Sequence, residues 1–263
     1  MKLLIADAGS TKTEWALLEG SACAPRTFET PGVNALMASA EALREAFAGL
    51  PAADRIVYYG AGCATPEVCR KVADALPAEA EVGSDMLGAG RALLGRQPGL
   101  AAILGTGSNS ASMADGQILR NMPPLGYILG DEGSGAALGR RLLREAYRFG
   151  LLRPELEAFA GMDYGQIIAR VYREPAANRW LASLVPFIVA NREALSDVIA
   201  AEFDAMFAAW ARFYPERRVA FTGGVASALS PELRAAAERA GFEITEILKR
   251  PMSGLILYHS HEF

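Results

Sequence analysis

Short apolar runs separated by turn-forming residues open the chain and predict β-strands. These runs cover residues 2–7, 14–19 and 25–30. Their close spacing favours an antiparallel meander of three strands. A helical period follows over residues 36–49, where one stripe is apolar from Leu36 to Phe47.

Strand and helix patterns then alternate to the end of the chain. The strands are predicted at residues 55–59, 80–82, 100–104, 111–113, 219–221 and 242–247. The helices are predicted at residues 66–76, 86–95, 133–149, 164–173, 179–192, 195–213 and 231–240, with a last one from Pro251. This alternation predicts an α/β protein.

A pattern of a strand, a polar turn and a second strand occurs twice along the sequence. The pattern first covers residues 2–19, and it returns where the strand at 100–104 runs into the turn GTGSNS. Two α/β lobes are the simplest architecture, with an N-terminal lobe of residues 1–104 and a C-terminal lobe of residues 105–250. The final helix, 251–263, can join the N-terminal lobe. No Pro-, Gly- or Ser-rich linker divides the lobes, so we expect them to meet over a cleft.

Composition narrows the classes of function. The chain has 263 residues, 51% of them hydrophobic, and a formal net charge of -4. This acidic balance, without a basic cluster, argues against a nucleic-acid partner. The sequence has no signal-peptide pattern and no apolar stretch long enough to span a bilayer, so we expect a cytoplasmic protein without a membrane partner.

Cysteine and histidine are too few to carry the chemistry. The cysteines Cys23, Cys63 and Cys69 form no C-x-x-C pair and are expected to be reduced thiols. His259 and His261 stand close to the end of the sequence, which excludes histidine-based triads elsewhere. Carboxylates, hydroxyls, amides and a cofactor must therefore supply the reactive groups.

The first polar turn, residues 7–13 (DAGSTKT), has the composition of a phosphate and metal site. Successive backbone N–H groups in a turn form a concavity for anions, and a neighbouring carboxylate can hold Mg²⁺ through water. An ordinary tight hairpin, with Asp and Gly as turn formers, explains the same residues. The G-x-x-x-x-G-K-[ST] and G-x-G-x-x-G patterns do not occur in this turn, so the mechanisms that depend on them are not indicated.

Two further turns favour the ligand-binding interpretation. Residues 104–110 (LGTGSNS) interleave two glycines with hydroxyl and amide side chains, and a polyphosphate held between two lobes needs a turn from each. In residues 221–227 (FTGGVAS), the paired glycines Gly223 and Gly224 leave room for a flat or bulky ligand group against the backbone.

The ordered set D-x-G-x-T-x-T, G-T-G-S and T-G-G resembles the actin, Hsp70 and sugar kinase superfamily of ATP-binding proteins. Within it, DAGSTKTEW, LGTGSNS, LGYILGDEGSGAALG and FTGGVAS together resemble the BadF/BadG/BcrA/BcrD-type ATPase family, in its N-acetylglucosamine kinase branch. The resemblance implies a two-lobed actin-like ATPase fold, a duplicated ribonuclease H-like fold, with nucleotide and sugar in the cleft between the lobes. It also implies a homodimer and an ATP-dependent kinase acting on the 6-hydroxyl of N-acetylglucosamine.

The resemblance also implies roles for the residues of the three turns. Asp7 would help to position Mg²⁺, and Gly223 and Gly224 would lie behind the adenosine of ATP. The β- and γ-phosphates would be held by Gly9, Ser10, Thr11, Lys12, Thr13, Gly105, Thr106, Gly107 and Ser108.

Asp85, in GSDMLGAGRALLG, matches the catalytic aspartate that family kinases carry at a helix start just before the second phosphate turn. The residues support this assignment independently, because a helix N-terminus favours the ionised carboxylate. An ionised carboxylate can take the proton of an attacking hydroxyl during phosphoryl transfer. Alternatively, Asp85 only caps its helix.

Four residues match positions that bind sugar hydroxyls in the related kinases, namely Asn34, Thr106, Ser108 and Asp131. Carboxylates and amides suit this role because each can bond two neighbouring sugar oxygens. Asp131 precedes a predicted helix, so capping is an alternative for it as well. The segment Pro123-Pro124-Leu125 replaces a glycine- and tryptophan-rich segment of the vertebrate enzymes, so we expect the pocket around the amide substituent to be built differently.

Other functions fit parts of the same pattern. A kinase for glucosamine or N-acetylmuramate would carry the same motifs, and a non-catalytic sugar or nucleotide sensor would keep the same cleft. The reductase activases of the family bind an iron–sulfur cluster through cysteines that follow the second phosphate turn. This chain has no cysteine after Cys69, which argues against that function.

Overall fold

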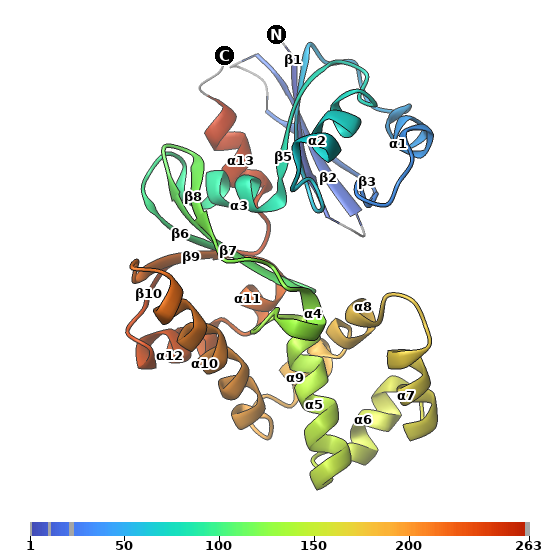
Figure 1. Ribbon diagram of the computed structural model, residues 1–263, viewed down its shortest axis with the longest axis vertical. Coiled ribbons are helices and arrows are strands. Elements are labelled where there is room, and N and C mark those ends of the chain that lie inside the picture. Colours follow the sequence, from blue (N-terminus) through green and yellow to red (C-terminus); the bar gives the residue numbers. More distant parts are fainter. Residues whose placement is uncertain (1, 10–11, 21–23, 261–263) are drawn as a thin grey trace. The chain divides into compact units, whose positions relative to one another are not determined.

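The computed structural model of the chain describes residues 2–9, 12–20 and 24–260. The predicted phosphate-binding residues Ser10 and Thr11 lie outside the described residues, as do Cys23 and His261. The chain forms two compact units, and Figure 1 labels the helices and strands of both. The first unit comprises Met1–Ala101, Met113–Leu119 and Arg250–Phe263, and the second comprises Ala102–Ser112 and Arg120–Lys249.

The first unit is built on a five-stranded sheet with the order β3-β2-β1-β4-β5. Its strands are β1 (Lys2–Ala8), β2 (Lys12–Glu19), β3 (Arg26–Pro31), β4 (Arg55–Gly60) and β5 (Glu79–Ser84). The first three strands pair antiparallel, which confirms the predicted meander. Strands β4 and β5 continue the sheet parallel to β1.

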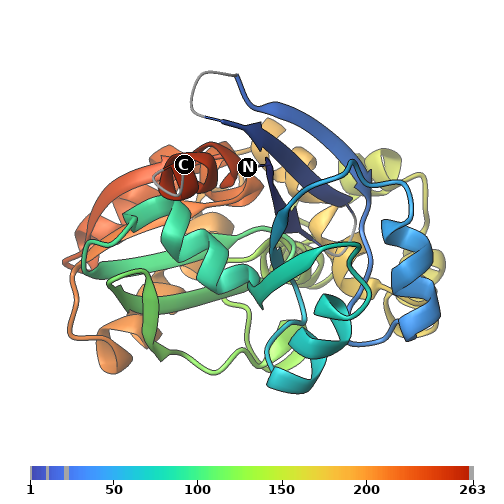
Figure 2. The same ribbon diagram turned by 90° about the horizontal axis from the view of Figure 1, so that it is seen from above.

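Helices cover both faces of this first sheet, which explains why β1 reads as a continuous apolar run (Figure 2). Helices α1 (Ala40–Phe47) and α2 (Pro66–Ala73) pack on the face of Leu4 and Trp15. Helices α3 (Asp85–Leu94) and α13 (Met252–His259) pack on the opposite face, against Leu3 and Ile5. Successive β1 residues therefore serve two separate cores.

Helix α1 is shorter than the helix predicted over residues 36–49. It begins after Ser39, whose side chain accepts the N–H of Ala42 at 3.2 Å. The residues before it form a turn in which the Asn34 carbonyl accepts the N–H of Ala38 at 2.9 Å. Leu36 is 59% exposed, so its assignment to the apolar stripe was wrong.

The second sheet has the order β10-β9-β6-β7-β8. Its strands are β6 (Gly99–Leu104), β7 (Ser108–Ala114), β8 (Gln117–Asn121), β9 (Arg218–Thr222) and β10 (Glu243–Leu248). The sequence pattern missed β8 because that strand is largely exposed and has no apolar alternation. In both sheets the first strand is central, flanked by the second and the fourth, so the strand order is duplicated.

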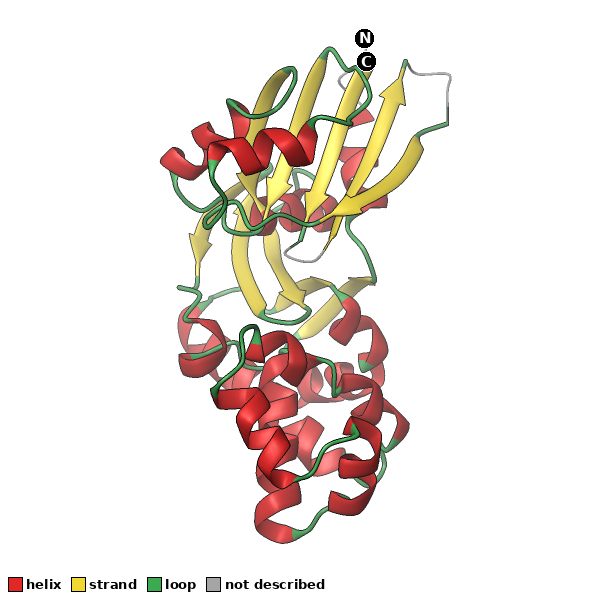
Figure 3. Cartoon of the chain, turned by 90° about the vertical axis from the view of Figure 1, so that its right-hand side faces the viewer, coloured by secondary structure: helices red, strands yellow, loops and turns green. Residues whose placement is uncertain are grey.

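The second unit carries most of the helices, which gather beyond its strands in Figure 3. They are α4 (Gly126–Leu129), α5 (Gly135–Phe149), α6 (Arg153–Ala160), α7 (Tyr164–Tyr172), α8 (Ala177–Ala182), α9 (Val185–Ala190), α10 (Ser196–Phe213), α11 (Gly224–Ala228) and α12 (Ser230–Arg239). The single helix predicted over 179–192 is instead two helices, because Pro186 lies in the first turn of α9 and cannot continue α8. No helix in the described part of the chain is long and apolar enough to cross a membrane.

Candidate active site

Asp7 lies near the carboxyl end of β1, the central strand of the first sheet. The strand register places it opposite Glu14 and beside Tyr59. Burial raises the pKa of Asp7 to about 7, with smaller contributions from the negative charges of Asp85 and Glu14, whereas Lys12 opposes the shift. The fold therefore concentrates negative charge around Asp7, and a bound cation would compensate it.

Asp85 is the first residue of α3 and directly follows β5. Ser84 is the N-cap, since its hydroxyl accepts the N–H of Leu87 at 3.1 Å, so the alternative that Asp85 caps the helix is wrong. The Asp85 carboxylate instead accepts the N–H of Met86 at 2.8 Å. Burial raises the pKa of Asp85 above its usual value, although the backbone hydrogen bonds oppose the shift.

Asn34 approaches the same edge of the first sheet. Strands β1, β4 and β5 run parallel, so their carboxyl ends lie along one edge. A Cβ added to Gly62, just after β4, would lie 3.6 Å from the side-chain oxygen of Asn34, which also accepts the N–H of Leu36 at 3.1 Å. Asp7, Asp85 and Asn34 thus belong to one edge of one sheet.

The first polar turn joins β1 to β2 at this edge. Gly9 donates its N–H to the Lys12 carbonyl at 3.0 Å. The Lys12 ammonium pairs with the carboxylate of Glu29 on β3, and Thr13 is buried in the strand pair. A phosphate at this turn would therefore compete with Glu29 for the lysine.

The second polar turn, in the second unit, is fixed to the start of α5. Gly105 donates its N–H to the Gly107 carbonyl at 3.0 Å. The carbonyls of Gly105 and Thr106 accept the first two N–H groups of α5 at 2.8 and 3.1 Å, so the turn satisfies donors that a helix start leaves unpaired. A Cβ added to Gly105 would meet nothing within 4 Å, which leaves room beside the backbone for a ligand.

Asp131 is bonded to this second turn. The N–H of Ser108 donates to the Asp131 carboxylate, although burial still raises the pKa of Asp131. A Cβ added to Gly107 would lie 2.9 Å from that carboxylate, so a larger residue here would displace the Asp131 side chain. The cap of α5 is Ser134, which accepts the N–H of Ala137 at 3.2 Å, and the capping alternative for Asp131 is therefore wrong.

A cavity of about 330 Å³ opens beside Ser108 and Asp131. One part of its lining is polar and another is apolar. The polar residues are Ser108, Asn109, Ser110, Asp131 and Glu132, and the others are Met122, Pro123, Pro124, Leu125, Gly130, Ala209 and Trp210. The sequence analysis missed Asn109, Glu132 and Trp210, and for Trp210 no local signal was present because it comes from the distant helix α10.

Gly223 and Gly224 have different structural environments. Gly223 has φ of 122°, and a Cβ added to it would lie 2.2 Å from the carbonyl oxygen of Leu104 on β6. Gly224 begins α11, and a Cβ added to it would meet nothing within 4 Å. Close backbone packing therefore accounts for Gly223, whereas only Gly224 has open space that a ligand could use.

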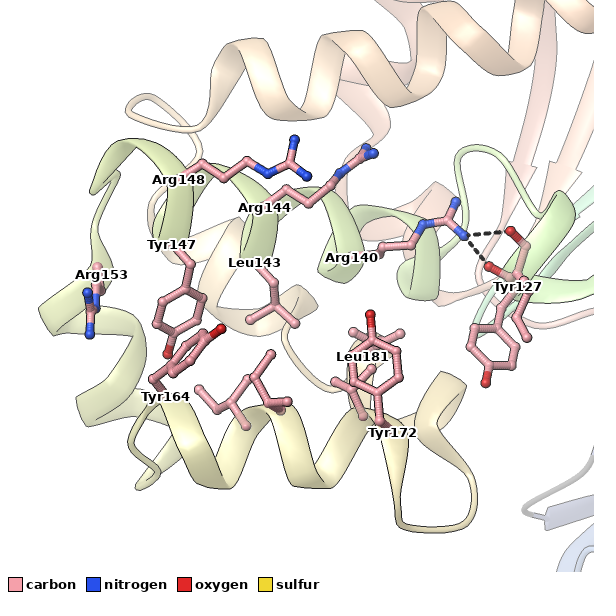
Figure 4. Close-up of a pocket in the computed structure, with 14 residues that line it drawn as sticks. Tyr127, Arg140, Leu143, Arg144, Tyr147, Arg148, Arg153, Tyr164, Tyr172 and Leu181 are labelled. Atoms are coloured by element: carbon pink, nitrogen blue, oxygen red, sulfur yellow. Dashed lines mark hydrogen bonds between the residues drawn. The ribbon is translucent and has the colours of Figure 1, made fainter.

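A larger cavity of about 930 Å³ lies between α5 and α7, with Leu143, Tyr147, Tyr164 and Tyr172 labelled in Figure 4. Arg140 at one end donates to the Ile128 carbonyl at 3.2 Å. None of the predicted site residues in the described part of the chain lines this cavity.

Comparison with solved structures gives full-length matches. The chain is similar to a proposed N-acetylglucosamine kinase from Porphyromonas gingivalis, with 34% identity over 98% of this chain and 99% of that one and a TM-score of 0.88. A proposed N-acetylglucosamine kinase from Chromobacterium violaceum is 25% identical over 98% of both chains, with a TM-score of 0.73.

A third structure, a ROK family glucokinase from Streptomyces griseus in complex with glucose and AMPPNP, shares the fold at 16% identity. It is matched over 98% of both chains with a TM-score of 0.61. No protein-family model matches the chain, and no curated protein matches it either.

These matches agree with the duplicated strand order and with the motifs at the strand ends. The fold is that of the actin-like ATPases, as the sequence motifs predicted. The chain belongs to the N-acetylglucosamine kinase branch of the BadF/BadG/BcrA/BcrD-type ATPase family, within the actin-like sugar kinase superfamily.

Proposed function

We propose that this protein is an ATP-dependent kinase that transfers the γ-phosphate of ATP to the 6-hydroxyl of N-acetylglucosamine. The observation that carries the proposal is the full-length similarity, at 34% identity, to a proposed N-acetylglucosamine kinase. The structural neighbours that include a glucokinase with bound AMPPNP support a sugar kinase more generally.

Asp85 is the proposed catalytic base. Phosphoryl transfer depends mainly on positioning and charge neutralisation, and it needs a group that accepts the proton of the attacking hydroxyl. The raised pKa of Asp85 makes its carboxylate a stronger base than an exposed aspartate. Ser84 already caps α3, so the Asp85 carboxylate is not needed as the cap and is available to a substrate.

Asp7 is the proposed ligand of a magnesium ion. The charge around Asp7 fits a cation, since burial and the neighbouring carboxylates raise its pKa to about 7. The described residues include no group of three or more His, Cys, Asp or Glu side chains arranged as a metal site. Mg²⁺ is usually held by one or two carboxylates together with substrate phosphates, so a single protein carboxylate is a suitable donor. When bound, the ion would neutralise charge on the ATP phosphates.

ATP would be bound by the polar turns of the two units. The turn from Gly9 to Thr13 and the turn from Gly105 to Ser108 are the proposed phosphate sites, and the open backbone at Gly224 supports an adenosine site at residues 223–224. Lys12 would exchange its partner Glu29 for a phosphate oxygen.

The sugar would be bound by Asn34, Thr106, Ser108 and Asp131. The cavity beside Asp131 combines carboxylate and amide groups with an apolar wall that contains Met122 and Pro123. That combination suits a sugar whose hydroxyls are accompanied by an apolar acetyl methyl group. Binding of both substrates between the lobes, and a homodimer, stay predictions from the family resemblance.

A coupled assay of ADP release over N-acetylglucosamine, glucosamine, N-acetylmuramate and glucose tests the proposal. We expect the highest kcat/KM with N-acetylglucosamine. Turnover that is higher with glucosamine or N-acetylmuramate would reassign the substrate, and no sugar-dependent ADP release with any of the four would overturn the kinase function in favour of a sensor.

A further inference from the structure

A cluster of polar side chains lies between the first sheet and helices α3 and α13. Tyr59, Arg91 and His259 are buried, with Tyr59 and His259 each 1% exposed, and the half-buried Glu81 completes the cluster. We propose that Tyr59 is a positioning residue for the transfer reaction, because its hydroxyl holds α3, and with it Asp85, in place against the sheet. The inference rests on the proposed function of Asp85 as the catalytic base.

Helix α3 lies directly on the ring of Tyr59. A Cβ added to Gly88, one turn after Asp85, would be 2.6 Å from the ring carbon Cγ of Tyr59. A Cβ added to Gly83, two residues before Asp85, would be 3.5 Å from Cδ1 of the same ring. The segment that carries Asp85 therefore bends around this ring, and any movement of α3 relative to β4 would move the carboxylate.

The hydroxyl of Tyr59 joins α3 to α13. Arg91 of α3 donates from Nη1 to the Tyr59 oxygen at 2.7 Å, and that oxygen lies 2.8 Å from Nε2 of His259 on α13. Burial raises the pKa of Tyr59 above its usual value, so the hydroxyl keeps its proton and can donate it to the histidine. One hydroxyl thus contacts buried polar groups from two different helices.

Arg91 extends the connection to two further elements. It donates from Nη1 to Glu81 of β5 at 2.9 Å and from Nε to the carbonyl of Gly116, in the turn between β7 and β8, at 3.0 Å. The guanidinium also lies over the rings of Tyr59 and Tyr258, 5.6 and 5.3 Å from their centroids. A buried arginine must keep such partners, so the loss of one is expected to shift the helix that carries it.

Helix α13 packs closely against α3. A Cβ added to Gly254 would lie 2.2 Å from the carbonyl oxygen of Ala92, which shows that the two backbones touch. Met252 and Leu255 fix α13 in the apolar core that also contains Leu3. The last helix of the chain thereby supports the helix whose first residue is the proposed base.

Small displacements of a catalytic group have large kinetic effects, because a misplacement of about 1 Å can cost roughly 100-fold in rate. The Asp85 carboxylate accepts hydrogen bonds from the backbone N–H groups of Met86 and of Asp85 itself. Both donors belong to α3 and move with it, so these bonds cannot hold the carboxylate relative to the rest of the unit. The contacts of α3 with Tyr59 and with α13 connect the helix, and with it Asp85, to the rest of the unit.

The test compares Tyr59→Phe with Tyr58→Phe. Both substitutions remove one hydroxyl from β4 and keep the ring, but the Tyr58 hydroxyl is buried without a hydrogen-bond partner among the described residues. For Tyr59→Phe we expect kcat for the preferred sugar to fall about tenfold, with the KM values for sugar and ATP changed by less than about twofold. Amide hydrogen exchange in residues 85–88 should become faster. Tyr58→Phe should change neither measurement.

Each outcome decides the inference. A Tyr59→Phe enzyme that melts at a lower temperature but keeps its kcat and its exchange pattern at 25 °C would show that the hydroxyl only contributes stability. Wild-type protein without turnover on any sugar would overturn the proposed function instead. In that case the exchange of residues 85–88 in the two variants still decides whether Tyr59 holds α3. His259→Gln, whose side-chain carbonyl can still accept the Tyr59 hydroxyl, should retain more of kcat than His259→Leu.

Discussion

The two sheets of this protein share one strand order but present different chemistry at their strand ends. In the first sheet, Asp7 and Asp85 are buried carboxylates whose pKa values are raised. In the second, the turn at residues 105–108 is bonded to the start of α5 and to Asp131, beside a cavity. Duplication of a topology therefore does not duplicate a function, because the loops at the strand ends carry the chemistry.

Under the proposed function, Asp7 and Asp85 would carry cation binding and proton transfer at the first sheet, whereas Asp131 and its cavity would carry sugar recognition at the second. Substitutions of Asp7 and Asp85 should therefore change mainly kcat, and those at residues 131, 223 and 224 mainly KM or local stability. The following experiments test that division, beginning with the largest expected effect.

Asp85→Asn should lower kcat about 1,000-fold, since a positioned general base contributes roughly 10² to 10⁴ in rate. The amide keeps the size of the side chain and can still accept the N–H of Met86, so folding should be preserved. The measurement is the coupled kinase assay with the preferred sugar. Asp74→Asn, an exposed aspartate at the end of α2, is the matched control and should leave kcat unchanged. A fully active Asp85→Asn enzyme would contradict the assignment of Asp85 as the catalytic base.

Gly223→Ala and Gly224→Ala separate packing from ligand binding in neighbouring glycines. The first should destabilise the fold by about 3 kcal/mol, because its Cβ would strike the Leu104 carbonyl and its backbone has positive φ. The second should change the free energy of unfolding by less than about 0.5 kcal/mol. Urea unfolding measures both effects.

Gly224→Ala should nevertheless raise the KM for ATP if adenosine lies against residue 224. An unchanged KM for ATP would show that Gly224 is not part of the adenosine site.

The raised pKa of Asp7 predicts a pH-dependent stability of the ligand-free protein. Its pKa is about 7 when folded, against about 3.9 when unfolded, so between these values the folded state holds a proton that the unfolded chain has released. The contribution of Asp7 to stability should therefore fall as pH rises from about 4 to about 7, by at most roughly 1.4 kcal/mol per pH unit.

Asp7→Asn should remove that dependence. The variant should be more stable than the wild type at pH 8, and the difference should shrink toward pH 4 as measured by urea unfolding. Equal pH slopes for the two proteins would contradict the pKa of Asp7. Loss of activity in the more stable variant would show that the carboxylate is retained for function.

Asp131→Asn is expected to have a smaller effect than Asp85→Asn, a rise of about tenfold in the KM for the sugar with kcat nearly unchanged. The size follows from the loss of a charged hydrogen-bond acceptor, about 1.5 kcal/mol. Asp197→Asn, at an exposed position in the first turn of α10, is the control. A drop in kcat with unchanged KM would contradict the assignment of recognition to the second sheet.

Local pattern predicted most elements of this fold, including the meander of β1 to β3 and the start of α3 after β5. It failed where apolar pattern and burial disagree. Leu36 fits a helical stripe but is exposed, and β8 is a strand with little apolar pattern. It also failed at Pro186, since the helix predicted over 179–192 ran across it.

Capping shows a second limit of local reasoning. Both Asp85 and Asp131 precede or begin a helix, and the sequence allowed each to be only a cap. The structure places serine in the cap position of both helices, at Ser84 and Ser134. Whether a residue caps a helix depends on where the helix begins, and a difference of one to three residues changes the answer. The position of the start depends on how the whole helix packs.

The sequence by itself determined the α/β class, the duplicated opening of the two halves, and the family, because turn chemistry and motif order are local properties of the chain. Only the tertiary structure brought Asp7 and Asp85 into electrostatic contact, separated the roles of Gly223 and Gly224, and connected Tyr59 to a histidine 200 residues away. These relations depend on distances and on burial. Both arise when strands and helices that are remote in the sequence pack together and exclude water.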